Sequence, residues 1–231
     1  MQGNESDFFI ADDRWKAAYP GARAGILVIK NIDNVPNDPN VDEFVESVEN
    51  ELREKFAGCS RDDFNKIPTI AAYNEYYKNF GKTYHVRPQV ESIAKGKSLP
   101  KISALLSVMF AAEVKNMLLT AGHDFDSLQL PIHIKVAEGG EEYIAMNGSA
   151  KKVEKGDMFM EDGEAIVSSI IQGPDARTKI TADTTDALFA IYAPAGIEGE
   201  AIVAHLTDIQ NAIKSFSSAA KTELLEVFEA K

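Results

Sequence analysis

The side chains that most often perform chemistry are few and widely spaced in this sequence. Its histidines lie far apart, without the spacing of metal ligands on one element: His85, His123, His133 and His205. The single cysteine, Cys59, follows Gly58 and has no flanking signature of a cysteine nucleophile. The residues therefore predict no metal site, and a buried or tolerated thiol rather than a reactive one.

Motifs of the common enzyme classes are also missing from the sequence. There is no GxxxxGKS or GxxxxGKT loop, no GxGxxG after a strand, and no CxxC, HExxH or GxSxG. A Ser-His-Asp triad stays open, because its members converge in space rather than along the chain. Conventional motifs thus assign no chemistry.

Charge argues against one broad class of partner. The 231 residues carry 24 Lys and Arg against 36 Asp and Glu, a net charge of −12, which disfavours binding of DNA or RNA through overall electrostatics. Residues 78 to 101 differ, with six Lys and Arg against one Glu, a net of +5. We expect this strip, with Lys95, Lys97 and Lys101, either to contact one stretch of RNA backbone or to be a solvated surface.

The composition also bears on location. No apolar run reaches the roughly 18 residues that a membrane-spanning helix needs, so no membrane partner is expected. The acidic segment Met1 to Asp7 is unlike a signal peptide, and a single cysteine fits a reducing compartment. We therefore expect a cytoplasmic protein.

The spacing of apolar residues predicts helices in the first half of the chain. Val41 to Phe56 has one apolar face, with Asn40 as its N-cap. Ile70 to Phe80 and a short segment after Pro88 are expected to be helical as well. Ile102 to about Thr120 is apolar almost all round, which predicts a buried helix.

Strand patterns dominate the second half. Alternating and β-rich segments predict strands at Phe8 to Ile10, Ala24 to Lys30, Ile132 to Val136, Glu142 to Met146, Ala165 to Ile171 and Ala187 to Tyr192. Helical spacing returns at Glu198 to Phe216 and Lys221 to Phe228. This order predicts an α+β fold: a mixed or antiparallel sheet packed against helices, with helical N- and C-terminal elaborations. No linker divides the chain, so we expect one domain over residues 1 to 231.

Several short motifs follow one another in a familiar order. They are YYKNFG at 76–81, RPQVESI at 87–93, GKSLPKISALL at 96–106, HDFD at 123–126, EDGEAIV at 161–167 and DTTDALF at 183–189. In this order the sequence resembles a stand-alone B3/B4 domain, the tRNA-editing module of the phenylalanyl-tRNA synthetase beta subunit. The resemblance is clearest over residues 70 to 195 and rests on the order and spacing of the motifs.

This resemblance implies a module with a cleft between sheet and helices. In the synthetase the cleft accepts the 3′ end of a wrongly charged tRNA and hydrolyses the ester. An aminoacyl ester is already activated, so a positioned water and a stabilised oxyanion suffice. The resemblance therefore implies aminoacylated tRNA as the partner and no metal or organic cofactor.

The resemblance also assigns roles to individual residues. His123 matches the family's active-site histidine, which would orient water or bind the terminal ribose; the alternative is a loop histidine bonded to nearby backbone. Gly173 would let substrate approach the backbone, or would simply form a turn. Arg87 would hold a phosphate or pair with Glu91 one helical turn on. Asp126 is expected to cap a helix.

Two positions depart from the family pattern. The family's Thr-Asn on the buried helix aligns near Met109 and Phe110, and its glutamate at the end of the apolar strand aligns near Ala190. Apolar side chains thus replace polar ones at three positions of the expected substrate site. We expect a pocket that favours an apolar aminoacyl group.

Three functional hypotheses follow. The leading one is a trans-acting aminoacyl-tRNA deacylase, or a descendant that still binds tRNA ends. The loss of polar groups at the substrate positions motivates a second, a non-catalytic module for RNA or a small amino-acid-like ligand. The third is a protein-interaction factor that uses acidic helices such as Val41 to Phe56. The aminoacyl group, the tRNA and the oligomeric state are left open by the sequence.

Overall fold

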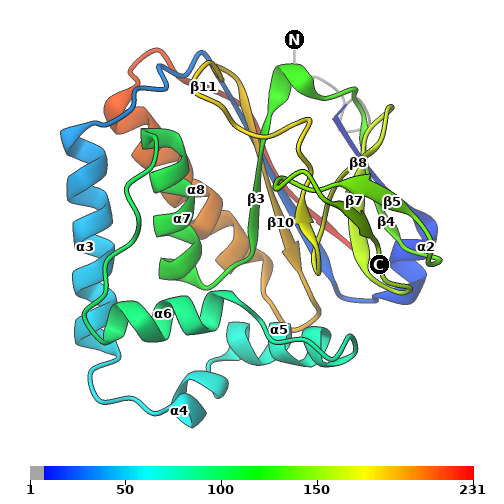
Figure 1. Cartoon of the computed structure of the whole chain (residues 1–231), viewed down its shortest axis with the longest axis horizontal. Helices are drawn as coiled ribbons and strands as arrows, with labels where there is room; N and C mark the ends of the chain where they lie inside the picture. The colour runs from blue at the N-terminus through cyan, green and yellow to red at the C-terminus, as the bar shows by residue number, and fades with distance from the viewer. Residues whose placement is uncertain (1–7) are drawn as a thin grey trace.

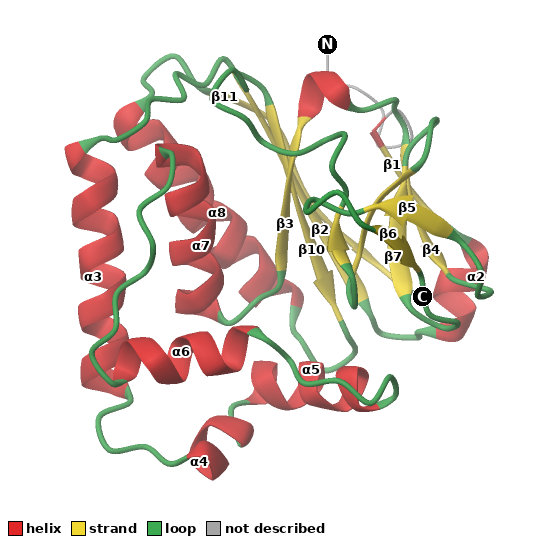
Figure 2. Cartoon of the chain, viewed as in Figure 1, coloured by secondary structure: helices red, strands yellow, loops and turns green. Residues whose placement is uncertain are grey.

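The computed structural model describes residues 8 to 231. The acidic segment Met1 to Asp7 lies outside the described residues. Helices gather on one side of the molecule and most strands on the other (Figure 2). The fold is α+β, as the sequence predicts. In the described part of the chain, no helix is long and apolar enough to cross a membrane.

An antiparallel sheet of four strands forms the middle layer. Its order is β11 (Lys221–Glu229), β2 (Arg23–Lys30), β10 (Ala187–Ala193) and β3 (Thr120–Asp124). Strands β2 and β10 are buried along almost their whole length. Because both faces of the sheet are covered, these two strands are nearly continuous apolar runs. Strand β3 lies at one edge of this sheet.

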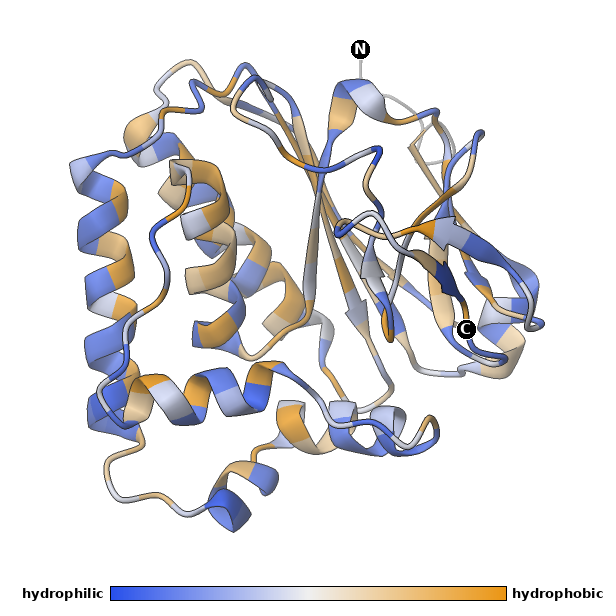
Figure 3. Ribbon diagram, viewed as in Figure 1, coloured by the Kyte–Doolittle hydropathy of each residue, from blue (hydrophilic) through white to orange (hydrophobic). Residues whose placement is uncertain are grey.

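Helices cover one face of the four-stranded sheet (Figure 1). The helices packed on it are α7 (Ala104–Asn116) and α8 (Gly199–Phe216), and α3 (Pro39–Lys55) packs outside them against both. The outer side of α3 is hydrophilic, whereas α7 is apolar along most of its length (Figure 3). Three shorter helices lie below them in the view: α4 (Arg61–Asn65), α5 (Pro68–Lys78) and α6 (Val86–Ala94).

The second layer is a five-stranded mixed sheet. Its order is β1 (Phe9–Ala11), β4 (Ile132–Val136), β7 (Met158–Glu161), β8 (Ile166–Ser169) and β9 (Gly173–Pro174). Only the pairing of β1 with β4 is parallel. A hairpin of β5 (Glu142–Ile144) and β6 (Ala150–Lys152), together with helix α2 (Asp13–Ala18), completes this side.

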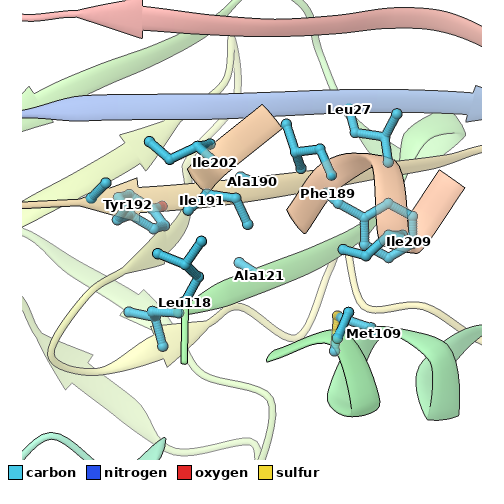
Figure 4. Close-up of a cluster of buried hydrophobic side chains, with 14 of the residues drawn as sticks. Leu27, Met109, Leu118, Ala121, Phe189, Ala190, Ile191, Tyr192, Ile202 and Ile209 are labelled. Carbon is cyan, nitrogen blue, oxygen red and sulfur yellow. The ribbon is translucent and has the colours of Figure 1, made fainter. Parts of the chain in front are cut away.

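Most of the apolar core lies between the helices and the four-stranded sheet. Figure 4 shows part of it, where Met109 of α7, Phe189 of β10 and Ile209 of α8 are all buried. Gly25 of β2 allows α8 to pack closely, because a Cβ at this position would lie 2.4 Å from Cγ2 of Ile202. Strand β2 and helix α8 are thus matched in shape at this position.

One predicted helix is wrong. Lys221 to Phe228 forms strand β11, which pairs with β2 along its length. A register shift between Thr222 and Leu224 breaks the alternation of the strand. The resulting spacing of Leu224, Leu225 and Phe228 imitates the apolar face of a helix.

Several helix ends also differ from the predictions. The N-cap of α3 is Asp38, whose side chain accepts a hydrogen bond from the backbone N–H of Asn40. Helix α7 ends at Asn116, because Met117 takes a left-handed conformation and the chain continues into β3. Asp124 rather than Asp126 caps the short 3-10 helix at Phe125–Ser127.

Candidate functional site

A cavity of about 370 Å³ lies beside the edge strand β3. Helix α7 lines one side with residues that recur at helical spacing: Leu106, Met109, Phe110 and Glu113. Residues of β3, β8 and β9 line the opposite side, together with Ile180. The cavity is therefore placed where the helices meet the second sheet, and most of its wall is apolar.

Gly122 of β3 sets the distance between the strand and α7. A Cβ at this position would lie 2.7 Å from Sδ of Met109 and 2.8 Å from Cδ1 of Ile180. A larger residue would therefore force these side chains to shift. The glycine allows the wall of the cavity to close around β3.

Glu113 is a buried carboxyl in this apolar wall. Only 3% of the residue is exposed. Its Oε2 accepts a hydrogen bond of 2.9 Å from the backbone N–H of Thr120. Burial raises the pKa of Glu113 to about 8, because a carboxylate is costly in an apolar environment. The carboxyl is therefore mostly protonated at neutral pH.

Further polar groups of the cavity come from both sheets and from the rim. Ser168 and Ser169 of β8 line it, and the hydroxyl of Tyr192 is hydrogen-bonded to that of Ser168. Ile102 and Met146 are 43% and 50% exposed and mark the mouth. Lys179 is exposed there too, and it forms no ion pair with any described residue.

Three of the residues predicted to bind substrate line the cavity together: Met109, Phe110 and Gly173. Gly173 has a φ of +81°, and a Cβ there would meet no atom within 4 Å. Its conformation favours glycine, and its carbonyl accepts a hydrogen bond from the hydroxyl of Tyr143. The chain is thus turned so that open space remains above Gly173.

His123 lies outside the residues that line the cavity. It is 1% exposed, and its Nδ1 is 2.7 Å from Oγ1 of Thr178. Thr178 in turn donates to the carboxylate of Asp175, so Nδ1 of His123 carries the proton and donates to Thr178. Nε2 of His123 has no hydrogen-bond partner among the described residues. Burial lowers the pKa of His123 to about 4, so the ring is neutral.

Arg87 and Ala190 also lie away from the cavity. Arg87 is 4% exposed and pairs with Glu91 at 3.3 Å, one helical turn further along α6. Ala190 is fully buried in β10, between Ile26 and Ala121 of the neighbouring strands. The structure therefore does not bring His123, Arg87 and Gly173 into one cleft.

The lysines predicted to contact RNA are exposed. Lys95 caps the end of α6 and Lys97 follows it. Lys101 pairs with Asp42 at 2.8 Å and directly precedes Ile102 at the mouth of the cavity. The three lysines thus lie on the segment that leads from α6 to the cavity.

The described residues contain no cluster of three or more His, Cys, Asp or Glu side chains placed to hold a metal ion. Glu113, Gly122 and Lys179 are cavity residues that were not singled out from the sequence. The signal for Glu113 was present, since it is one of few charged residues in the apolar run 102–120. The signal for Gly122 was its place directly before His123, in a segment for which no strand was predicted.

Comparisons with known proteins found one family profile and a similar solved structure. The B3/4 domain profile matches residues 72–215. A crystal structure of an N-terminal fragment of the phenylalanyl-tRNA synthetase beta subunit from Pyrococcus horikoshii is similar, with a TM-score of 0.48 and 14% identity. The similarity covers 93% of this chain and 50% of the fragment, so the chain spans about half its length. No curated protein matched the sequence. Since the profile spans more than half of the chain, the protein belongs to the B3/4 domain family.

Proposed function

We propose that this protein binds the 3′ end of an aminoacylated tRNA and hydrolyses the ester of an apolar, mischarged aminoacyl group in trans. The aminoacyl group would occupy the cavity beside β3. The observation that carries the proposal is that Met109, Phe110 and Gly173, three of the five positions that the family resemblance marks for substrate, line one cavity.

The size and lining of the cavity suit such a group. Its volume of about 370 Å³ falls within the range of roughly 300–1,000 Å³ that is usual for small-ligand sites. Burying an apolar side chain against Met109, Phe110 and Ile180 is favourable. Discrimination would then rest on shape and on the few polar groups of the wall.

Ester hydrolysis in this cavity needs a held water and donors for the developing oxyanion. Ser168 and Ser169 of β8 and Tyr192 of β10 are hydroxyl-bearing residues that line it. We assign them the positioning of water, because His123 lies outside the lining. The tRNA backbone would meet the lysines that lead to the mouth, Lys97 and Lys101, and the unpaired Lys179.

Deacylation of a full set of correctly and wrongly charged tRNAs tests the proposal. We expect one apolar aminoacyl class to be released and Met146→Trp, which fills the mouth, to slow its release at least about tenfold. Ile144→Trp is the matched control, because Ile144 is 53% exposed on the same hairpin and does not line the cavity. Equal rates in both variants would contradict the proposal.

A second candidate is a non-catalytic module that holds a small amino-acid-like ligand. The burial of His123 away from the cavity favours it, because the family's catalytic histidine then has no access to the ester. Binding of charged tRNA ends without release of any aminoacyl group would support this alternative.

We also propose that the chain acts as one domain. One apolar cluster extends from Phe9 to Ala230 and joins both layers. A single cooperative unfolding transition followed by two probes tests this proposal; two separate transitions would contradict it.

A further inference from the structure

Glu113 is set into the cavity in a fixed orientation. It lies one turn after Met109 and Phe110 on the face of α7 that lines the cavity. The backbone N–H that holds its Oε2 belongs to Thr120. Thr120 is itself held, since its hydroxyl bonds the carbonyl of Leu118 and Nε2 of His205, each at 2.9 Å. The carboxyl therefore points in one direction without a charged partner.

The second oxygen of this carboxyl is free to meet a ligand. In the part of the chain that the structure describes, no hydrogen bond to another residue is made by Oε1 of Glu113. This oxygen is not among the fully enclosed unpaired atoms, so it is open to the cavity that Glu113 lines. An oxygen that is open to the cavity can be bonded by water or by a ligand that displaces this water. The hydrogen bond from Thr120 occupies Oε2 only, so the fold leaves Oε1 to a ligand in a wall that is otherwise mostly apolar.

We propose that Glu113 is the specificity-determining residue of this cavity. Through Oε1 it donates a hydrogen bond to an uncharged acceptor, a carbonyl or hydroxyl oxygen, on an otherwise apolar ligand. The ligand class is thus an apolar acyl or aminoacyl chain with one neutral oxygen at its inner end. This inference rests on the proposed function in one respect only, namely that the ligand is attached to the 3′ end of a tRNA.

A charged ligand group fits the site less well. Two opposite charges would both have to leave water, and the wall around them is apolar, so desolvation opposes their pairing. A protonated carboxyl needs no counter-ion, and its O–H is a donor for a neutral oxygen.

Apart from Lys179 at the mouth, the groups that face Glu113 stay neutral over the pH range in which Glu113 titrates. Those that face it from the packed elements are Tyr73 and Tyr77 of α5, Tyr84, His85, His205 of α8 and, across the cavity, Tyr192 and Lys179. Burial raises the pKa values of these tyrosines and lowers those of His85 and His205. Lys179 is the exposed cation of the group and lies at the mouth.

Three small probes of one shape test this inference without tRNA. They are ethylbenzene, acetophenone and 1-phenylethylamine, which carry no polar group, a carbonyl and an ammonium. We expect the wild type at pH 7 to bind acetophenone about three- to tenfold more tightly than ethylbenzene, the gain of one buried hydrogen bond. The amine should bind more weakly than the ketone. Calorimetric titration measures all three affinities.

Two variants and a pH series complete the test. Glu113→Leu should bind ketone and hydrocarbon equally, whereas Glu113→Gln, whose amide also donates, should keep the preference at every pH. In the wild type the preference should disappear above about pH 8, as the carboxyl loses its proton. An unchanged preference in Glu113→Leu, a stronger affinity for the amine, or no binding of any probe would overturn the inference. Release of aminoacyl groups from tRNA alongside any of these results would leave the proposed function standing.

Discussion

The two faces of the four-stranded sheet are built on different principles. The face toward α7 and α8 is apolar, and close contacts there depend on glycines such as Gly25 and Gly122. The face toward the second sheet carries buried polar pairs, including His123 with Thr178 and Tyr192 with Ser168. The face toward the helices stabilises the fold through close apolar packing. The face toward the second sheet buries hydrogen-bonded polar groups.

The cavity lies where these two faces meet, at the open edge of β3. Its apolar wall is an extension of the helix side, and its hydroxyls belong to the sheet side. Glu113 is the exception, a carboxyl on the apolar side. The cavity is thus a gap in the apolar packing between the helices and the sheets. Glu113 is the one carboxyl among the described residues that line it.

The largest expected effect on stability comes from the sheet face that packs against α7 and α8. Phe189→Ala removes a fully buried ring and should lower the free energy of unfolding by about 3–5 kcal/mol. Val203→Ala, on the exposed side of α8 at 42% exposure, should change it by no more than about 0.5 kcal/mol. Urea denaturation of both variants measures the difference. Equal losses would contradict the view that this face carries the stability.

Glu113 predicts a dependence of stability on pH. Its pKa is about 8 in the folded protein against 4.5 for the ordinary group, so the folded state binds the extra proton between these values. The stability from this group is complete below pH 4.5 and is lost as pH rises through 8. Between pH 6.5 and 8 the loss should be about 2 kcal/mol.

Glu113→Gln is the matched variant for this pH series, because an amide of the same shape does not titrate. Its free energy of unfolding should stay flatter over the same range, as measured by urea denaturation at each pH. Parallel curves for wild type and variant would show that Glu113 titrates normally.

Asp157 tests the polar side of the comparison. This buried carboxyl accepts hydrogen bonds from the hydroxyl of Tyr76 at 2.7 Å and from the N–H of Ile171 at 3.2 Å. Asp157→Ala leaves both donors without this partner and should cost about 1–3 kcal/mol. Asp126→Ala, on an exposed residue, serves as the control. If the free energy of unfolding falls no more in Asp157→Ala than in Asp126→Ala, the buried hydrogen bonds of Asp157 do not contribute to stability.

The smallest expected effect concerns tRNA affinity. Lys97→Glu should weaken binding of tRNA several-fold and reduce the slope of log affinity against log salt by about one. Lys214→Glu, an exposed lysine on α8, carries the same change of charge elsewhere. If both variants bind alike, the strip of lysines beside the cavity has no special part in RNA contact.

Much of the helix side could be predicted from the sequence. Apolar spacing predicted the helices at α3, α5 and α8, and the all-round apolar run predicted the buried α7. These signals are local, because each lies within about 20 consecutive residues. Strand β11 was predicted as a helix, because its bulge breaks the alternation of apolar and polar residues that indicates a strand.

The cavity could not be predicted from such local patterns. The cavity forms only when β3, β8 and α7 meet, and these elements are separated by up to about 60 residues. Sequence comparison led to Met109, Phe110 and Gly173, but the direction of a side chain from a strand depends on register. In the segment that became β3, His123 and Gly122 are neighbours with opposite faces, and only Gly122 lines the cavity.

Methionine methyl NMR tests the central claim most directly. Met109 and Met146 line the cavity, whereas Met158 and Met160 are buried in β7 outside its lining. We expect non-hydrolysable 3′-aminoacylamino-adenosine analogues with apolar aminoacyl groups to shift the methyl signals of Met109 and Met146 and to leave those of Met158 and Met160 in place. Shifts confined to Met158 and Met160, or no shift at saturating analogue, would contradict the assignment of the cavity to the aminoacyl group.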